Sequence, residues 1–165
     1  MDLECIKKIR LMDLEFRTLH SKLFEERFFQ KIAVSENAEL KELSKNQPVV
    51  LTIIGLEKEI MPSTIGKYVG MDRSSLSRMV DSLEEKGFVW RKNDPEDRRK
   101  ILISLTEKGE RCLEILNKIT EEMVAELLSL ADEQDFKDFE KSLEVMLRVF
   151  KKVDAAFSIK MYLTN

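Results

Sequence analysis

A run of short polar and cationic side chains lies at residues 73–78, with the sequence Arg-Ser-Ser-Leu-Ser-Arg. Serine hydroxyls and arginine guanidinium groups can reach base edges and phosphates when they project from the first turns of a helix in the major groove of DNA. The candidate contacts are Arg73, Ser74, Ser75, Ser77 and Arg78. Ser63 and Thr64 begin the preceding predicted helix, where free N–H groups suit a phosphate.

A second cationic cluster surrounds one short predicted loop. It consists of Arg91, Lys92, Arg98, Arg99 and Lys100. The whole chain has a net charge of −3, but residues 62–106 hold nine basic and seven acidic side chains, a net of +2. The total charge therefore does not exclude nucleic acid and only disfavours non-specific binding. A solvated hairpin tip is the alternative interpretation of the charge.

The other chemically capable side chains are isolated. His20 is the single histidine, so neither a zinc site of several histidines nor a His-based triad can be assembled. Cys5 and Cys112 lie far apart, which is typical of reduced thiols. The sequence contains no glycine-rich phosphate loop and no Gly-x-Ser-x-Gly elbow. We therefore expect no enzyme activity, no catalytic residue, no metal and no cofactor.

The composition indicates one mainly α-helical domain. The chain has 165 residues, of which 43% are hydrophobic, enough for a core without disulfides. Five glycines and three prolines are too few for the turns of an all-β fold. No stretch approaches the roughly 18 apolar residues of a membrane span, and the first residues do not resemble a signal peptide. These features predict a cytoplasmic protein without a membrane partner.

Two apolar seams at the ends of the chain predict long dimerisation helices over residues 1–34 and 107–165. Apolar side chains recur at spacings of three and four in residues 9–23 and again in residues 136–153. The first seam consists of Ile9, Met12, Phe16, Leu19 and Leu23. One small core cannot cover both seams, so we expect a homodimer. The alternative is that both helices fold back on their own core.

The central residues 44–106 divide into short elements. Ser44 and Gln47 have the spacing of a capping box. Two helices follow, with Ser63 and Gly70 as the expected ends of the first and Asp72 and Gly87 as those of the second. Apolar alternation then predicts a β-hairpin over 88–92 and 101–105. Helix, glycine-containing turn, helix and charged hairpin in this order form a winged helix-turn-helix.

These central residues resemble the MarR family of transcriptional regulators. The matching segments are Ser75-Leu76-Ser77-Arg78, Leu83-Glu84-Glu85-Lys86-Gly87-Phe88-Val89, Asp97-Arg98-Arg99 and Thr106-Glu107-Lys108-Gly109. The resemblance implies a mainly α fold, a winged helix-turn-helix with a short hairpin wing and long N- and C-terminal dimerisation helices. It also implies a homodimer that binds double-stranded DNA.

The resemblance assigns roles to individual residues. Ser74, Ser75, Ser77 and Arg78 match positions of the recognition helix that touch bases and phosphates. Arg98 and Arg99 match the wing arginines, and Lys100 extends that cluster. Asp97 matches a carboxylate that holds an arginine by paired hydrogen bonds, and a turn-forming role is the alternative. Trp90 stands where a polar residue is usual, and it either packs beneath the wing or is half exposed.

The resemblance further implies that a small aromatic or anionic effector can bind near the dimer seam. Here its walls would be His20, Phe24, Arg27, Phe28, Ile53 and Leu56, with Phe29 beside them. Aromatic rings with one cation suit a carboxylate that has an apolar body. Ordinary core packing is the alternative, and we expect His20 to be half buried among its apolar neighbours.

The sequence thus predicts a homodimeric regulator, a repressor by expectation, that binds an inverted repeat and is released by a small effector. Repression and activation are not distinguished by the sequence. Two further hypotheses remain: a thiol-based redox sensor acting through Cys5, and a structural helical dimer that does not bind DNA.

Overall fold

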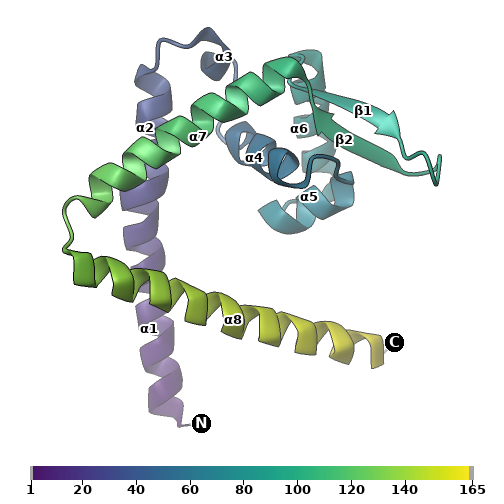
Figure 1. Ribbon diagram of the computed structural model, residues 1–165. Coiled ribbons are helices and arrows are strands. Elements are labelled where there is room, and N and C mark those ends of the chain that lie inside the picture. The colour runs from purple at the N-terminus through teal and green to yellow at the C-terminus, as the bar shows by residue number, and fades with distance from the viewer. Residues whose placement is uncertain (1, 164–165) are drawn as a thin grey trace. The chain divides into compact units, whose positions relative to one another are not determined.

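The computed structural model describes residues 2–163, and the side chains of residues 2–157 (Figure 1). The chain divides into two compact units, one ending at Met123 and one beginning at Val124. The elements are α1 (Leu3–His20), the π-helical η1 (Ser21–Glu25), α2 (Glu26–Val34), α3 (Ala38–Lys41), α4 (Gln47–Glu57), α5 (Pro62–Val69), α6 (Arg73–Glu85), β1 (Val89–Asn93), β2 (Ile101–Leu105), α7 (Glu107–Leu128) and α8 (Glu133–Leu163). A mainly helical chain with one hairpin confirms the predicted fold class.

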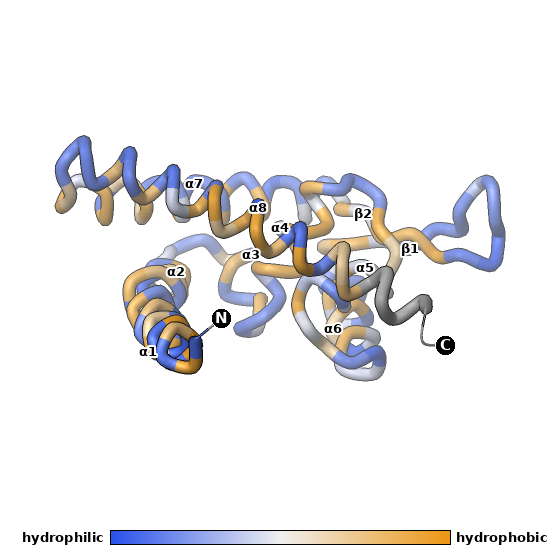
Figure 2. Tube along the Cα trace, turned by 90° about the horizontal axis from the view of Figure 1, so that it is seen from below, coloured by the Kyte–Doolittle hydropathy of each residue, from blue (hydrophilic) through white to orange (hydrophobic). Residues whose placement is uncertain are grey.

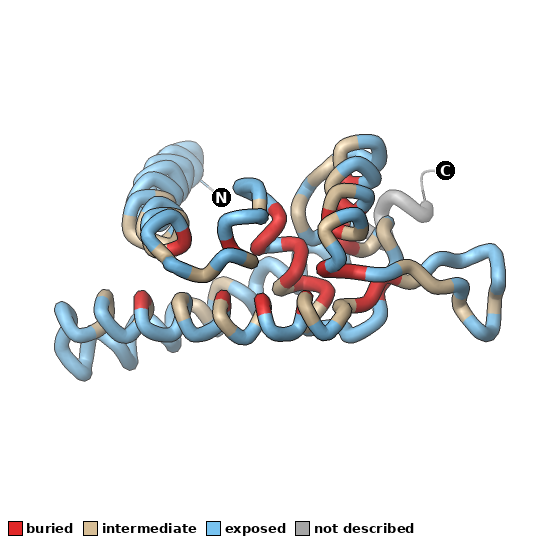
Figure 3. The backbone as a smooth tube through the Cα atoms, turned by 90° about the horizontal axis from the view of Figure 1, so that it is seen from above, coloured by how far each residue is buried: buried red, intermediate tan, exposed pale blue. Residues whose placement is uncertain are grey.

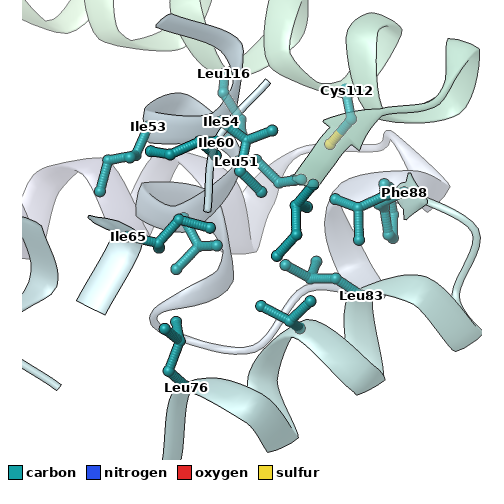
Figure 4. Close-up of a cluster of buried hydrophobic side chains, with 14 of the residues drawn as sticks. Leu51, Ile53, Ile54, Ile60, Ile65, Leu76, Leu83, Phe88, Cys112 and Leu116 are labelled. Atoms are coloured by element: carbon teal, nitrogen blue, oxygen red, sulfur yellow. The ribbon is translucent and has the colours of Figure 1, made fainter. Parts of the chain in front are cut away.

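The core of the first unit joins α4, α5, α6, the hairpin and the first turns of α7 (Figure 4). Leu51 and Ile54 of α4, Leu83 of α6 and Phe88 are fully buried in it. The predicted inward face of α6 is confirmed, because Leu76 and Val80 are buried with Leu83 and Met79 packs against this cluster. Buried residues gather on the same short elements in Figure 3.

The two strands of the hairpin pair in an antiparallel register from Val89↔Leu105 to Asn93↔Ile101. Ile60 pairs with Ile103, the middle residue of β2, through two backbone hydrogen bonds of 3.1 and 2.9 Å. These bonds attach β2 to the segment that leads into α5. The hairpin is therefore fixed at the middle of β2, and its charged loop extends away from the core.

Two predicted helix starts are wrong in detail. Met61, not Ser63, is the N-cap residue of α5, because Pro62 suits the first helical position and starts the helix earlier. The Gln47 side chain accepts from the Ser44 N–H at 2.9 Å as expected, but the Gln47 N–H donates to the Ser44 backbone oxygen and not to its hydroxyl. In contrast, Asp72, Gly70 and Gly87 occupy the predicted boundaries of their helices.

The predicted first helix is present, but the π-helical turn η1 interrupts it between α1 and α2. None of the 18 residues of α1 is buried (Figure 3). The His20 ring lies 5.7 Å from the Phe16 ring and 5.0 Å from the Phe24 ring between centroids. His20 is nevertheless exposed and not half buried, because nothing in the described part of the first unit covers this face of α1.

The second unit consists largely of α8, which Asp132 caps as predicted by accepting the Gln134 and Asp135 N–H groups, each at 2.8 Å. Large apolar side chains remain exposed along α8. They are Phe136, Phe139, Val145, Leu147, Val149, Phe150, Val153 and Phe157. Among the described helices of the chain, none is long and apolar enough to span a bilayer.

Candidate nucleic-acid interface

The turn between α5 and α6 is built from Gly70, Met71 and Asp72. Gly70 has a φ of 62°, in the left-handed region that favours glycine, and it ends α5. Asp72 is extended and caps α6 by accepting the backbone N–H groups of Ser74 and Ser75 at 2.9 and 3.0 Å. Local sequence chemistry therefore sets the two helices of the helix-turn-helix.

The hydroxyls of Ser74 and Ser75 are engaged by the same carboxylate. Ser74 Oγ lies 2.5 Å from Asp72 Oδ1, and Ser75 Oγ lies 2.7 Å from Asp72 Oδ2. A carboxylate can only accept, so both hydroxyls donate their protons to Asp72. These hydrogen bonds hold the pKa of Asp72 well below its usual range. Ser74 and Ser75 are thus fixed in the cap and keep only acceptor capacity.

Arg73, Ser77 and Arg78 are exposed on α6. The guanidinium group of Arg78 makes one long contact, 3.5 Å from Nη2 to Ser75 Oγ. This distance is at the limit of a hydrogen bond, so the guanidinium group can exchange the contact for a base edge or a phosphate. Of the predicted α6 residues, Ser77 and Arg78 are therefore the best placed for contacts outside the protein.

The wing loop carries the predicted arginines at its surface, and Figure 2 shows it as hydrophilic between β1 and β2. Arg98, Arg99 and Lys100 are exposed. Asp97 Oδ1 accepts from Arg99 Nε at 3.1 Å and from the Arg99 backbone N–H at 3.2 Å. These bonds hold the pKa of Asp97 below its usual range. Asp97 thus both orients an arginine and forms the turn.

An open groove of about 930 Å³ lies between α5, α6 and the hairpin. Of the predicted contacts, it is lined by Ser63, Arg73, Ser77, Arg99 and Lys100. Five basic side chains and one acidic side chain, Asp81, line it. Thr64, Ser74, Ser75, Arg78, Asp97 and Arg98 lie outside its lining.

Sequence reasoning missed two basic residues of this groove, Lys67 and Arg91. Lys67 stands four residues after Ser63 and so shares its helix face, a spacing that could have identified it. Arg91 was visible only as one charge beside the loop. Trp90 is 54% exposed, so it does not pack beneath the wing.

The residues of the predicted effector site have mixed surroundings. His20 stacks on Phe24, and the rings of Phe28 and Phe29 meet edge to face at 5.5 Å. Ile53 is buried in the core, whereas Leu56 is 78% exposed. None of these side chains lines the α5–α6 groove or the shallow hollow on α1 beside Leu11 and Leu14.

The two cysteines differ in environment. Cys5 is exposed on α1, and Cys112 is buried in the core. Burial, assisted by the nearby Glu39 carboxylate, raises the pKa of the Cys112 thiol to about 11. Cys112 therefore stays protonated at neutral pH. Among the described residues, no group of three or more His, Cys, Asp or Glu side chains could hold a metal ion.

Comparison with known proteins places this lobe in a family. The protein-family sequence model described as "MarR family" matches residues 43–101. The chain carries a MarR-family domain. The HTH-type transcriptional regulator SarZ of Staphylococcus saprophyticus is 34% identical over 85 residues, covering 52% of this chain and 58% of that protein. The transcriptional repressor MprA of Escherichia coli is 32% identical over 87 residues, covering 50% and 49%. This chain thus spans about half the length of these curated relatives.

Solved structures share the MarR-family fold over most of the chain. FabT of Streptococcus pneumoniae in complex with DNA matches with a TM-score of 0.69 at 19% identity, covering 88% of this chain and 99% of that one. A mutant MarR of Escherichia coli complexed with operator DNA matches with a TM-score of 0.61 at 25% identity, covering 89% and 99%. The winged helix-turn-helix predicted from the sequence is confirmed.

Proposed function

We propose that this chain is a transcriptional regulator that binds double-stranded DNA sequence-specifically in the cytoplasm, as a homodimer on an inverted repeat. The observation that carries the proposal is the groove between α5, α6 and the hairpin, which five basic side chains line, including Arg73 of α6 and Arg99 and Lys100 of the wing. Basic side chains on one concave face supply phosphate affinity, and an exposed helix supplies base contacts. The names of its regulator and repressor relatives support the same role.

The proposed contacts divide the work between three elements. Arg78 and Ser77 on α6 read base edges in the major groove. Arg98, Arg99 and Lys100 bind phosphates or the minor groove, where negative potential attracts arginine. Ser63 and Thr64 lie in the first turn of α5, where the Ser63 N–H can meet a phosphate, whereas the Thr64 N–H donates to the Met61 carbonyl at 2.9 Å and leaves its hydroxyl for such a contact.

The uncovered apolar faces support the homodimer. On α1, Ile9, Met12 and Leu19 are 55%, 59% and 50% exposed. Such a continuous apolar face is rare on a monomer and typical of an interface. A two-fold dimer presents two recognition helices, so we expect half-sites roughly 10 base pairs apart, centre to centre.

The proposal is tested by footprinting on the DNA upstream of the protein's own gene, followed by affinity measurements. Arg78→Ala should weaken operator binding by about 1–3 kcal/mol and relax base choice, whereas loss of Arg98 and Arg99 should weaken all sequences and reduce the salt dependence. Lys118→Ala on α7 removes one exposed charge outside the lobe and is the control. Absence of any protected site would contradict the proposal, and a monomeric mass by light scattering would contradict the dimer.

We also propose effector control through the aromatic residues at the end of the first helix. Two ring pairs, His20–Phe24 at 5.0 Å and Phe28–Phe29 at 5.5 Å, together with the neighbouring Arg27 would suit an aryl carboxylate. A ligand that prefers the conformation with wrongly spaced recognition helices would lower DNA affinity. At least one member of an aryl carboxylate panel should release operator DNA. Arg27→Ala should reduce that release without weakening DNA binding in the absence of the compound. A panel that changes neither melting temperature nor DNA binding would leave this cluster as packing.

A further inference from the structure

Arg91 in β1 binds the recognition helix through both terminal nitrogens of its guanidinium group. Nη1 donates to Glu84 Oε2 at 2.5 Å, and Nη2 donates to Asp81 Oδ1 at 2.5 Å. Its side chain is 27% exposed, compared with 91% for that of Arg99 at the wing tip. Arg91 therefore belongs to the contact between the hairpin and α6 more than to the solvent-facing charge of the wing.

The chemistry of this contact requires an arginine. Asp81 and Glu84 stand three residues apart, so their carboxylates lie on one face of α6 and repel each other. A guanidinium group is a planar fork that can donate to two carboxylates at once, whereas a lysine ammonium is a single point charge. Arg91 relieves the repulsion and joins β1 to two positions of α6 that are three residues apart.

The contact lies level with the backbone support of the hairpin, because Arg91 pairs with Ile103 in the strand register and Ile103 pairs with Ile60. Nearer the base, the Phe88 N–H donates to the Leu83 carbonyl at 2.9 Å. One residue beyond Arg91 toward the tip, Lys92 pairs with Glu59, before α5, and not with α6. Arg91 thus couples the middle of β1 to the recognition helix.

We propose that Arg91 is a positioning residue that sets the wing relative to α6, so that Arg98 and Arg99 reach the same DNA half-site as Arg78. This inference rests on the proposed function. Because Asp81 also lines the basic groove, Arg91 additionally neutralises the one carboxylate that would repel a phosphate there. Arg91 also lines this groove, but both terminal nitrogens of its guanidinium group are already engaged by the two carboxylates.

A double-mutant cycle on operator affinity tests the role. Arg91→Ala, the Arg98→Ala and Arg99→Ala pair, and the combination of all three are compared with the unchanged chain. If Arg91 acts through the wing, Arg91→Ala alone should weaken binding about 10-fold, and removing the wing arginines afterwards should weaken it by much less than in the unchanged chain. Arg91→Lys keeps the charge but replaces the two separate donor nitrogens of the planar fork by a single ammonium nitrogen, so it should also weaken binding.

Lys92→Ala is the matched control, because it removes an equal charge from the next residue of the same strand. Lys92→Ala should change operator affinity little. In the combined variant, its fold-change in affinity should simply multiply with the fold-change caused by removing Arg98 and Arg99, as expected for independent sites. Equal melting temperatures show that the variants are folded. If Arg91→Ala does not fold, Arg91→Lys takes its place in the double-mutant cycle. Full multiplication of the Arg91 and wing effects, or wild-type affinity for Arg91→Lys, would overturn the inference. An unchanged chain that binds no DNA would instead overturn the proposed function.

Discussion

The winged helix-turn-helix lobe and the first helix use apolar side chains in opposite ways. The 11-residue α4 has six buried residues, whereas the 18-residue α1 has none. Short helices are marginal by themselves, so tertiary packing stabilises those of the lobe. The longer α1 leaves an apolar face exposed. The lobe therefore buries its own apolar side chains, while the face of α1 stays available for the proposed dimer.

The largest effect on stability is expected from a cavity in the core of the lobe. Phe88 is the largest of the fully buried side chains. We expect Phe88→Ala to lower the free energy of unfolding by about 3–5 kcal/mol, because the lost apolar contacts leave a cavity. Leu11→Ala on α1, at a site that is 67% exposed, is the control and should change it far less. Urea unfolding followed by circular dichroism measures both, and equal effects would contradict the comparison.

The converse experiment places a charge in the seam of α1. Phe16 is 42% exposed, and its ring lies within the apolar spacing of the seam. Phe16→Glu should leave the fold of the lobe intact but raise the dimer dissociation constant about 100-fold, since a buried charge would be unpaired. Analytical ultracentrifugation over a concentration series measures the change. Thr18→Glu lies outside the seam spacing and should not dissociate the dimer; an unchanged dimer in Phe16→Glu would refute the seam.

A smaller effect is expected from pH at the start of the recognition helix. The pKa of Asp72 is lowered in the folded chain, so its stabilisation is present above the unfolded pKa of about 3.9 and is lost as the pH falls toward the folded value. Asn caps helices as well as Asp but does not titrate. Asp72→Asn should therefore lose less stability than the unchanged chain between about pH 5 and pH 2. If the melting temperatures of Asp72→Asn and of the unchanged chain fall equally over that pH range, the linkage is disproved.

The smallest predicted effect concerns Gly66 in α5. A Cβ at this position would lie 3.4 Å from Leu76 Cδ2 and from the Met71 carbonyl oxygen, close to ordinary contact. Gly66→Ala should raise the free energy of unfolding by up to about 1 kcal/mol, because alanine loses less backbone entropy in a helix. Thermal unfolding should show a higher melting temperature. A lower melting temperature would mean that Leu76 cannot adjust.

Much of the fold could be predicted because helix ends depend on local chemistry. Asp72 accepts N–H groups two and three residues away, and Gly70 and Gly87 adopt positive φ regardless of what surrounds them. Ser63 was assigned wrongly within the same local rules, since Pro62 was a competing start signal. Charge patterning likewise located the wing loop. These features need only neighbours in sequence.

Other features were decided by tertiary contacts. The glycine of the Thr106-Glu107-Lys108-Gly109 segment is required because a Cβ at Gly109 would lie 2.1 Å from the Phe88 carbonyl oxygen. The engagement of Arg91 by Asp81 and Glu84 depends on how the hairpin packs on α6, so its charge alone could not separate it from the DNA-facing arginines.

The sequence by itself determined the order of the main elements, most of their ends and the spacing of the apolar seams, because backbone hydrogen bonding and helical periodicity act over a few residues. Only the tertiary structure decided which cations face the groove and which hold the wing, and how far the seams stay uncovered. The reason is that a charged side chain can reach any partner that the fold brings near, and the sequence spacing does not record that choice.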